Sequence, residues 1–196
     1  SLLYKSYYWK GESYYHLKNY TAALNTYSQL YNKNNQLYSS SLYSQAYCYL
    51  HLQDYGRSIN KFQSALDYHK EHKFLYDIFM RIGDNYFVLM DYQLAIHFYE
   101  KALQLTGFED DYASYKKSTA YVLLGDYNNA VSSFKSLINT FSKSNYVDDA
   151  IYDLGNTYIL AQDLDLALKT FMSLATDFQN SLFYASAKLK LGLVYY

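Results

Sequence analysis

The chain of 196 residues contains no proline, seven glycines and one cysteine. Because proline is absent, there is no proline-rich linker or polyproline segment, and so few glycines disfavour a fold of many short strands joined by tight turns. The single cysteine excludes an internal disulfide framework and a thiolate-rich zinc site, and we expect Cys48 to be a buried, unreactive thiol. No apolar run approaches the roughly 18 residues of a membrane span, so this segment does not predict direct membrane insertion.

An excess of charge of either sign is lacking as well. The 17 lysines and arginines and 18 acidic residues leave a net charge of −1, which argues against a nucleic-acid partner or an anionic membrane surface. Aromatic residues, by contrast, are abundant: 28 tyrosines and 11 phenylalanines raise the aromatic share to 20%, and 51% of all residues are hydrophobic. Such a composition predicts a folded chain and excludes a disordered one.

A repeat runs along the chain at intervals of 35 or 37 residues, anchored on Tyr20, Tyr55, Tyr92, Tyr127 and Leu164. Nine residues before each anchor lies a small residue: Gly11, Ala46, Gly83, Ser118 and Gly155. Six before it lies a tyrosine: Tyr14, Tyr49, Tyr86, Tyr121 and Tyr158. Seven after it lies an aromatic residue: Tyr27, Phe62, Tyr99, Phe134 and Phe171. Small residues permit close approach of two helices, and we expect the aromatic rings to fill the space between them.

The spacings of three and four residues predict two amphipathic helices in each repeat and no strands. A polar residue precedes every anchor and is a typical helix N-cap, because its side-chain oxygen can accept a hydrogen bond from an unpaired backbone N–H. These predicted caps are Asn19, Asp54, Asp91, Asp126 and Asp163. Since one helix pair cannot bury its apolar face alone, the pairs are expected to stack into an all-α, right-handed α-solenoid.

These residues resemble the tetratricopeptide repeat (TPR) over essentially the whole chain. Tyr152-x-x-Gly155-x-x-Tyr158 is a good match to the start of the family pattern. The terminal proline of the pattern is missing throughout, and residues such as Asn35, Gly107 and Ser142 stand near its place. We predict a single TPR domain over residues 1–196, with repeats at about 4–38, 39–75, 76–110, 111–147 and 148–184 and a partial sixth at 185–196. Since the chain begins without methionine, in an apolar-periodic segment, we expect it to be a fragment of a longer protein.

Two connectors share one form, Phe141-Ser-Lys-Ser144 and Phe178-Gln-Asn-Ser181, each followed by an aromatic residue and then alanine. This form is similar to the junction of bacterial envelope TPR proteins, which include the periplasmic partner of the Tol-Pal system and the lipoprotein of the outer-membrane assembly machine. The resemblance favours a periplasmic or outer-membrane-associated location over the cytoplasm.

In TPR proteins the first helix of each repeat lines a concave groove. The resemblance places twelve residues there: Tyr8, Glu12, Tyr15, Tyr43, Tyr47, Met80, Asp84, Phe87, Tyr115, Thr119, Tyr152 and Asn156. Tyrosine offers rigid, amphipathic contact area, so the hypothesis is a trough that holds an extended or helical peptide. The alternative is that a tyrosine-rich protein simply carries tyrosine on exposed helix faces. Exchange of Tyr43 and Tyr115 for serine is expected to leave helicity intact and to weaken partner capture.

The chemistry of a chaperone-tail adaptor is absent from the corresponding positions. Some TPR proteins hold a C-terminal carboxylate with lysine, asparagine and arginine, but here those places include Tyr8, Glu12, Asp77 and Arg81, of which only Arg81 fits. A negatively charged trough would repel a carboxylate, so this class of partner is disfavoured.

No residue pattern indicates catalysis, a cofactor or a metal site. Ser-His-Asp spacing, a glycine-rich phosphate loop, H-E-x-x-H and C-x-x-C are all missing from the chain. The acidic pairs Asp110-Asp111 and Asp148-Asp149 precede first helices, where they complement the helix dipole. Four histidines are expected to be solvated at the surface: His16, His51, His69 and His72.

The sequence therefore predicts a scaffold that binds a protein or peptide partner and is not itself an enzyme, serving a bacterial envelope-assembly or secretion machine. Two alternatives stay open: a cytosolic TPR regulator or peptide sensor, and the docking arm of an enzyme whose catalytic domain lies outside this segment. Leu189, Leu193 and Tyr196 form an uncapped apolar face on the last, unpaired helix, which predicts either further repeats in the parent protein or cover of this face by another copy of the chain or by a partner.

Overall fold

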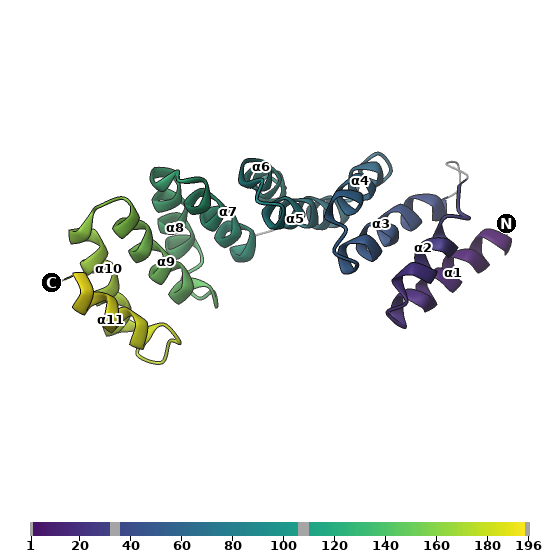
Figure 1. The fold of residues 1–196 in the computed structure, drawn as a ribbon. Helices are drawn as coiled ribbons and strands as arrows, with labels where there is room; N and C mark the ends of the chain where they lie inside the picture. The colour runs from purple at the N-terminus through teal and green to yellow at the C-terminus, as the bar shows by residue number, and fades with distance from the viewer. Residues whose placement is uncertain (1, 32–35, 106–109, 195–196) are drawn as a thin grey trace. The chain divides into compact units, whose positions relative to one another are not determined.

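The computed structural model describes residues 2–31, 36–105 and 110–194, and every regular element within them is an α-helix (Figure 1). The prediction of an all-α fold is thus confirmed. Contacts divide the chain into two compact bodies, the N-terminal body (Ser1–Thr106) and the C-terminal body (Gly107–Tyr196). Three residues named above, Asn35, Gly107 and Tyr196, lie outside the described residues.

The N-terminal body consists of three helix pairs. Their first helices are α1 (Leu2–His16), α3 (Gln36–His51) and α5 (His72–Val88). Their second helices are α2 (Tyr20–Tyr27), α4 (Tyr55–Leu66) and α6 (Tyr92–Leu103). The two helices of each pair pack on each other, α2 packs on α3 and α4 on α5, and α1 also contacts α3. First helices that neighbour each other can therefore form a shared surface.

The C-terminal body repeats this arrangement with α7 (Asp111–Leu124), α8 (Tyr127–Thr140), α9 (Val147–Leu160), α10 (Leu164–Asp177) and α11 (Tyr184–Val194). The pairs α7–α8 and α9–α10 are joined through contacts of α8 with α9, and α11 packs on α10. Leu189 and Leu193 of α11 are each 65% exposed.

All five second helices begin at the predicted anchor, and all five predicted N-caps are confirmed. In each case a side-chain oxygen of the cap accepts a hydrogen bond from the backbone N–H three residues later, at 3.1 or 3.2 Å. The capping residues are Asn19, Asp54, Asp91, Asp126 and Asp163. Cap chemistry thus sets where the second helices begin.

The residue before each cap lies in the left-handed region of backbone space. In four of the five turns it is not glycine: Lys18, Gln53, Met90 and Gln162 have φ of 58–61°. Only Gly125, at φ 81°, supplies the residue type that adopts this conformation without strain.

The small residues of the first helices face the buried aromatic rings of the second, as predicted. The five rings, Tyr27, Phe62, Tyr99, Phe134 and Phe171, are all 0% exposed. A Cβ added at Gly11 would lie 2.4 Å from the ring of Tyr27, and one added at Gly155 would lie 2.6 Å from Phe171. The two helices therefore approach closely because no side chain stands between the backbone and the ring.

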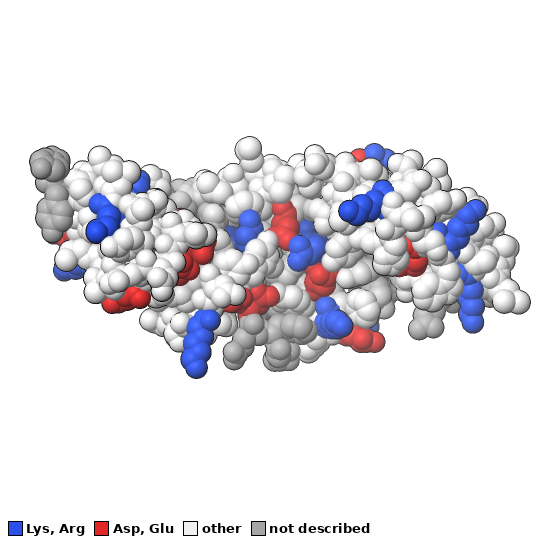
Figure 2. Space-filling view, turned by 90° about the horizontal axis from the view of Figure 1, so that it is seen from below, with Lys and Arg blue, Asp and Glu red and all other residues white. Residues whose placement is uncertain are grey.

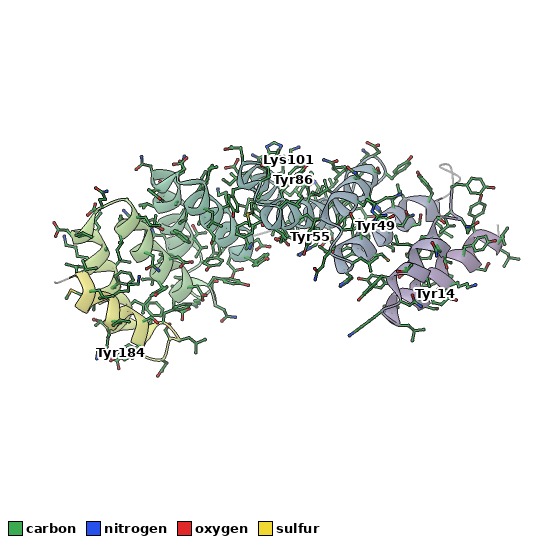
Figure 3. All side chains as sticks on the ribbon, in the orientation of Figure 1. Tyr14, Tyr49, Tyr55, Tyr86, Lys101 and Tyr184 are labelled. Carbon is green, nitrogen blue, oxygen red and sulfur yellow. The ribbon has the colours of Figure 1, made fainter. Side chains whose placement is uncertain are left out.

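Figure 3 labels Tyr14, Tyr49 and Tyr86 on the first helices α1, α3 and α5, where they are half-buried. Cations cover two of these rings: Lys10 Nζ lies 5.8 Å from the ring centre of Tyr14, and the Arg57 guanidinium lies 4.7 Å from that of Tyr49. In these two helix pairs a cation of the chain itself therefore covers the tyrosine ring.

Charged side chains of both signs are interspersed on the face drawn in Figure 2. Among the described helices, none has the length and apolar character that crossing a membrane requires.

Candidate functional site

Four of the predicted groove residues come together in the N-terminal body. A cavity of about 200 Å³ lies between α1 and α3 and is lined by Glu12, Tyr15, Tyr43, Ser44 and Tyr47. Ser44 was not predicted, although it directly follows Tyr43 on the same helix. All five side chains are half-buried, so each retains surface that a ligand could contact.

Tyr43 and Tyr47 are held in place by a shared acceptor. Their hydroxyls donate to the same Asp77 oxygen at 2.6 and 2.5 Å, and both rings pack edge-on against Phe62 with centroids 5.9 and 5.2 Å away. Burial, and next the hydrogen bond to Asp77, raise the pKa of both hydroxyls above the ordinary value for tyrosine. Both tyrosines therefore stay protonated donors with fixed rings.

Glu12 is the carboxylate at the cavity wall. One of its oxygens accepts hydrogen bonds from Tyr27 at 2.5 Å and from Ser44 at 2.8 Å. Beside it, the Tyr15 hydroxyl is hydrogen-bonded to Nε2 of His51 at 3.0 Å, and burial raises the pKa of Tyr15 to about 12. The wall thus combines one ionisable carboxylate with aromatic rings whose hydroxyls are already engaged.

Acidic residues of the first helices also have a structural role, which was not predicted. Glu12 accepts the hydroxyl of Tyr27, and Asp84 accepts that of Tyr99 at 3.0 Å. Where the second helix carries phenylalanine instead, the same first-helix position holds a residue that is not acidic: Tyr47, Thr119 or Asn156. This correlation between positions 15 residues apart was available in the sequence.

Asp77 and Asp153 were also missing from the predicted set, although each accepts the hydroxyl of a groove tyrosine. Both are acidic residues on the first helix that follows the tyrosine, 34 and 38 residues along the chain. A search for carboxylates about one repeat after each groove tyrosine would have found them.

The prediction for Met80 is wrong. Met80 occupies the same repeat position as Tyr8 and Tyr43, but it is only 1% exposed and belongs to the core. A tyrosine keeps its hydroxyl at the surface, whereas the methionine side chain has no polar end and is covered completely. Phe87, further along α5, is half-buried and lies edge-on to Tyr92 at 5.5 Å.

The predicted residues of the C-terminal body are all half-buried: Tyr115 and Thr119 on α7, and Tyr152 and Asn156 on α9. The Tyr115 hydroxyl donates to Asp153 at 2.7 Å, and its ring stacks on Tyr146 at 5.3 Å. The ring of Tyr152 stacks on Phe183 at 4.7 Å. Burial raises the pKa of the Asp153 carboxyl, which the hydrogen bond from Tyr115 partly counteracts. Both rings are thus engaged with the connector that follows.

The two similar connectors have one geometry. Ser144 accepts from the backbone N–H of Tyr146 at 2.9 Å and donates to Asp111 at 2.5 Å. Ser181 accepts from Phe183 N–H at 3.0 Å and donates to Asp148 at 2.6 Å. The acidic residues interpreted as helix-dipole partners therefore also fasten the next connector to the preceding first helix.

Cys48 is fully buried, as predicted, and burial raises the pKa of its thiol to about 12, which is consistent with an unreactive thiol. The expectation of a solvated histidine is wrong for His69. Its ring stacks on Phe74 at 4.7 Å, and its Nε2 is buried without a hydrogen-bond partner among the described residues.

No group of three or more His, Cys, Asp or Glu residues in the described ranges could hold a metal ion.

Comparisons with known proteins agree with this architecture. Two models of the tetratricopeptide repeat match the chain, one at residues 5–34, 112–144 and 149–181 and the other at 76–107, and together they cover more than half of it. A comparison with curated proteins found no match.

Several solved structures have the same fold. The apo form of RapI has 18% identity and a TM-score of 0.78 over 100% of this chain, which spans 60% of the RapI chain. MamA from Desulfovibrio magneticus RS-1 has 17% identity and a TM-score of 0.74, covering 93% of this chain and 98% of its own. YrrB, described as a TPR protein with an unusual peptide-binding site, has 20% identity and a TM-score of 0.71, covering 91% and 88%. The chain belongs to the tetratricopeptide repeat family of helical protein-interaction scaffolds.

Proposed function

We propose that the N-terminal body binds an extended or helical peptide segment of a partner protein along the first helices α1 and α3. The observation that carries this proposal is the cavity lined by Glu12, Tyr15, Tyr43 and Tyr47, which are residues of the predicted groove. Concave sites with aromatic walls and a few placed polar groups are typical of ligand binding. The likeness to YrrB supports a peptide as the class of ligand.

The fixed geometry of the tyrosines favours binding. Because Asp77 and Phe62 already hold the rings of Tyr43 and Tyr47, little side-chain entropy remains to be lost when a partner docks. Tyrosine anchors of this kind often dominate the free energy of binding at protein interfaces. The scaffold itself needs no catalytic group, and we propose that the chain is not an enzyme.

A selection experiment tests the peptide site. Dodecamer peptides displayed on phage are selected on the immobilised chain, and the enriched sequences are synthesised and measured by fluorescence anisotropy. Ser44→Arg should fill the cavity without removing a core side chain, and we expect it to weaken binding by about tenfold or more. Ser64→Arg makes the same change at an exposed position of α4 and should bind as the wild type does.

Either of two results would contradict the peptide site. The selection could enrich no peptide, or the enriched peptides could bind Ser44→Arg and the wild type equally well. Circular dichroism spectra and melting curves of both variants exclude misfolding as the cause of a loss.

We further propose that the scaffold serves an assembly or secretion machine of the bacterial cell envelope, in the periplasm or at the outer membrane. The support is the connector form shared by residues 141–150 and 178–187, with its bound serine. The competing proposals are a cytosolic peptide sensor and a docking arm of an enzyme. Fractionation of the native cells with an antibody to the chain should recover it with periplasmic or outer-membrane proteins, and recovery in the cytosol would refute the envelope role.

A further inference from the structure

We propose that the cavity between α1 and α3 receives the cationic side chain of a lysine or arginine in the partner segment, with Glu12 as its counter-ion. The rings of Tyr15, Tyr43 and Tyr47 would form its walls. This inference rests on the proposed peptide-binding function and specifies the chemistry of the partner.

Two carboxylates, Glu12 and Asp84, occupy the same repeat position but differ in their neighbours. Asp84 accepts a tyrosine hydroxyl and is also neutralised by Arg81, three residues before it, at 2.5 Å. Glu12 likewise accepts a tyrosine hydroxyl, but the residue three before it is Trp9. Among the described residues, no cation pairs with Glu12. The chain thus provides a guanidinium for Asp84 but none for Glu12, whose charge a cation of the partner can neutralise.

The electrostatics of the cavity walls also favour a cation. Tyr43 and Tyr47 donate their hydroxyls to Asp77, which places negative charge at the outer end of both rings. The faces of such rings attract ammonium and guanidinium groups, and the attraction grows when the cation is partly desolvated. Arg81 Nε lies 3.5 Å from the other oxygen of Asp77, but the same guanidinium also pairs with Asp84, so it offsets only part of this charge.

The shape of the site selects a side chain over other cations. A cavity of about 200 Å³ has room for several water-sized groups and hence for the head and part of the stem of a long side chain. A metal ion would need several oxygen or nitrogen ligands, whereas most of the wall is aromatic. A carboxylate of the partner would face Glu12 and be repelled. Lysine and arginine fit both the charge and the apolar stem.

The direct test is an NMR titration of the ¹⁵N-labelled chain. The probes are N-acetyl-arginine methylamide and N-acetyl-lysine methylamide, with N-acetyl-citrulline methylamide as the neutral analogue of the first. We expect saturable shifts of the backbone amides of residues 12–15 and 43–47 with the two cationic probes. Citrulline should bind about tenfold more weakly, because it lacks the charge that Glu12 attracts.

Three variants separate charge from structure. Glu12→Gln keeps a carbonyl acceptor for Tyr27 and Ser44 but removes the charge, and should weaken both cationic probes by about tenfold. Trp9→Arg should place a guanidinium beside Glu12, as Arg81 lies beside Asp84, and so compete with the probes. Glu71→Gln, at an exposed site without a side-chain cap bond, is the matched control and should leave binding of the probes unchanged.

The outcomes are distinct for the two proposals. Absence of shifts, equal binding of citrulline, or unchanged binding to both Glu12→Gln and Trp9→Arg would overturn the cation site. Peptides from the phage selection that lose binding to Ser44→Arg but bind Glu12→Gln as well as the wild type would overturn it too, while leaving the peptide-binding function intact. If Glu12→Gln fails to fold, the result for Trp9→Arg decides.

Discussion

In every turn between paired helices, the residue before the N-cap adopts the same left-handed backbone conformation. Lys18, Gln53, Met90 and Gln162 adopt a left-handed conformation that costs a residue with a Cβ about 1–2 kcal/mol, whereas Gly125 adopts it freely. The caps that follow these residues were predictable from the sequence, but the strained backbone conformation was not, because the residue types at this position share no property.

Substitution of Met90 by glycine is therefore expected to raise the free energy of unfolding by about 0.5–1 kcal/mol. Met90 is 74% exposed, so little packing is lost. Gly125→Ala, which introduces a Cβ at the equivalent turn, should lower the free energy of unfolding by about 1 kcal/mol. Urea denaturation followed by circular dichroism measures both, and a loss of stability in both variants would contradict the explanation from backbone strain.

A second residue-scale prediction concerns the half-buried carboxyl of Asp153. Burial raises its pKa in the folded chain, so the folded chain holds this proton more tightly than the unfolded chain does. Stability should therefore fall as pH rises through that pKa. Asp153→Asn keeps an acceptor for Tyr115 and should be more stable than the wild type at pH 7, with the advantage shrinking toward pH 4.

The control is Asp165→Asn, at an exposed site in the first turn of α10. There the negative charge of Asp165 interacts favourably with the helix dipole, so loss of this charge should lower stability slightly at pH 7. Melting temperatures between pH 4 and pH 8 distinguish the two variants. A stability difference for Asp153→Asn that does not change with pH would exclude the buried charge as its cause.

At the scale of helices, the distance between paired helices depends on the small residue that faces each ring. Gly155→Ala would bring a Cβ to 2.6 Å from Phe171, and we expect a loss of about 1–3 kcal/mol. Gly56→Ala makes the same change in α4 with no atom within 4 Å, and should stabilise by about 0.5–1 kcal/mol. Urea denaturation should show changes of opposite sign in the free energy of unfolding, and stabilisation of both variants would show that helix propensity decides.

The sequence was sufficient to predict the helix pairs, because their period, caps and small-residue positions recur in every repeat. It identified the pair α3–α4 through Ala46, Asp54 and Phe62, although the family models leave this pair unmatched. Which side chains meet across neighbouring pairs was not predictable in the same way. Tyr43, for example, packs on Phe62 and Phe74 and binds Asp77, so Tyr43→Ser is expected to destabilise the fold rather than leave it intact.

For the whole molecule, the sequence predicted a single TPR domain, and within it the structure describes two compact bodies. Periodicity reports the fold of each repeat but not how tightly successive repeats pack, which depends on connector geometry. The connectors anchored by Ser144 and Ser181 illustrate this: their motif is visible in the sequence, but their hydrogen bonds to Asp111 and Asp148 are visible only in the structure. The cation site needs only the N-terminal body, so it is independent of how the two bodies are arranged.

Self-association is the last prediction for the whole molecule, and α11 is where we expect it. Leu189 and Leu193 are one turn apart and each is 65% exposed, and exposed apolar pairs of this kind favour association. Sedimentation velocity should show an average mass that rises with concentration, and the pair Leu189→Lys and Leu193→Lys should abolish the rise. Met172→Lys, at a 49% exposed site of α10, is the control and should leave it unchanged. A wild-type chain that stays monomeric at all concentrations would refute association through this face, because removal of this apolar area from water is its only proposed driving force.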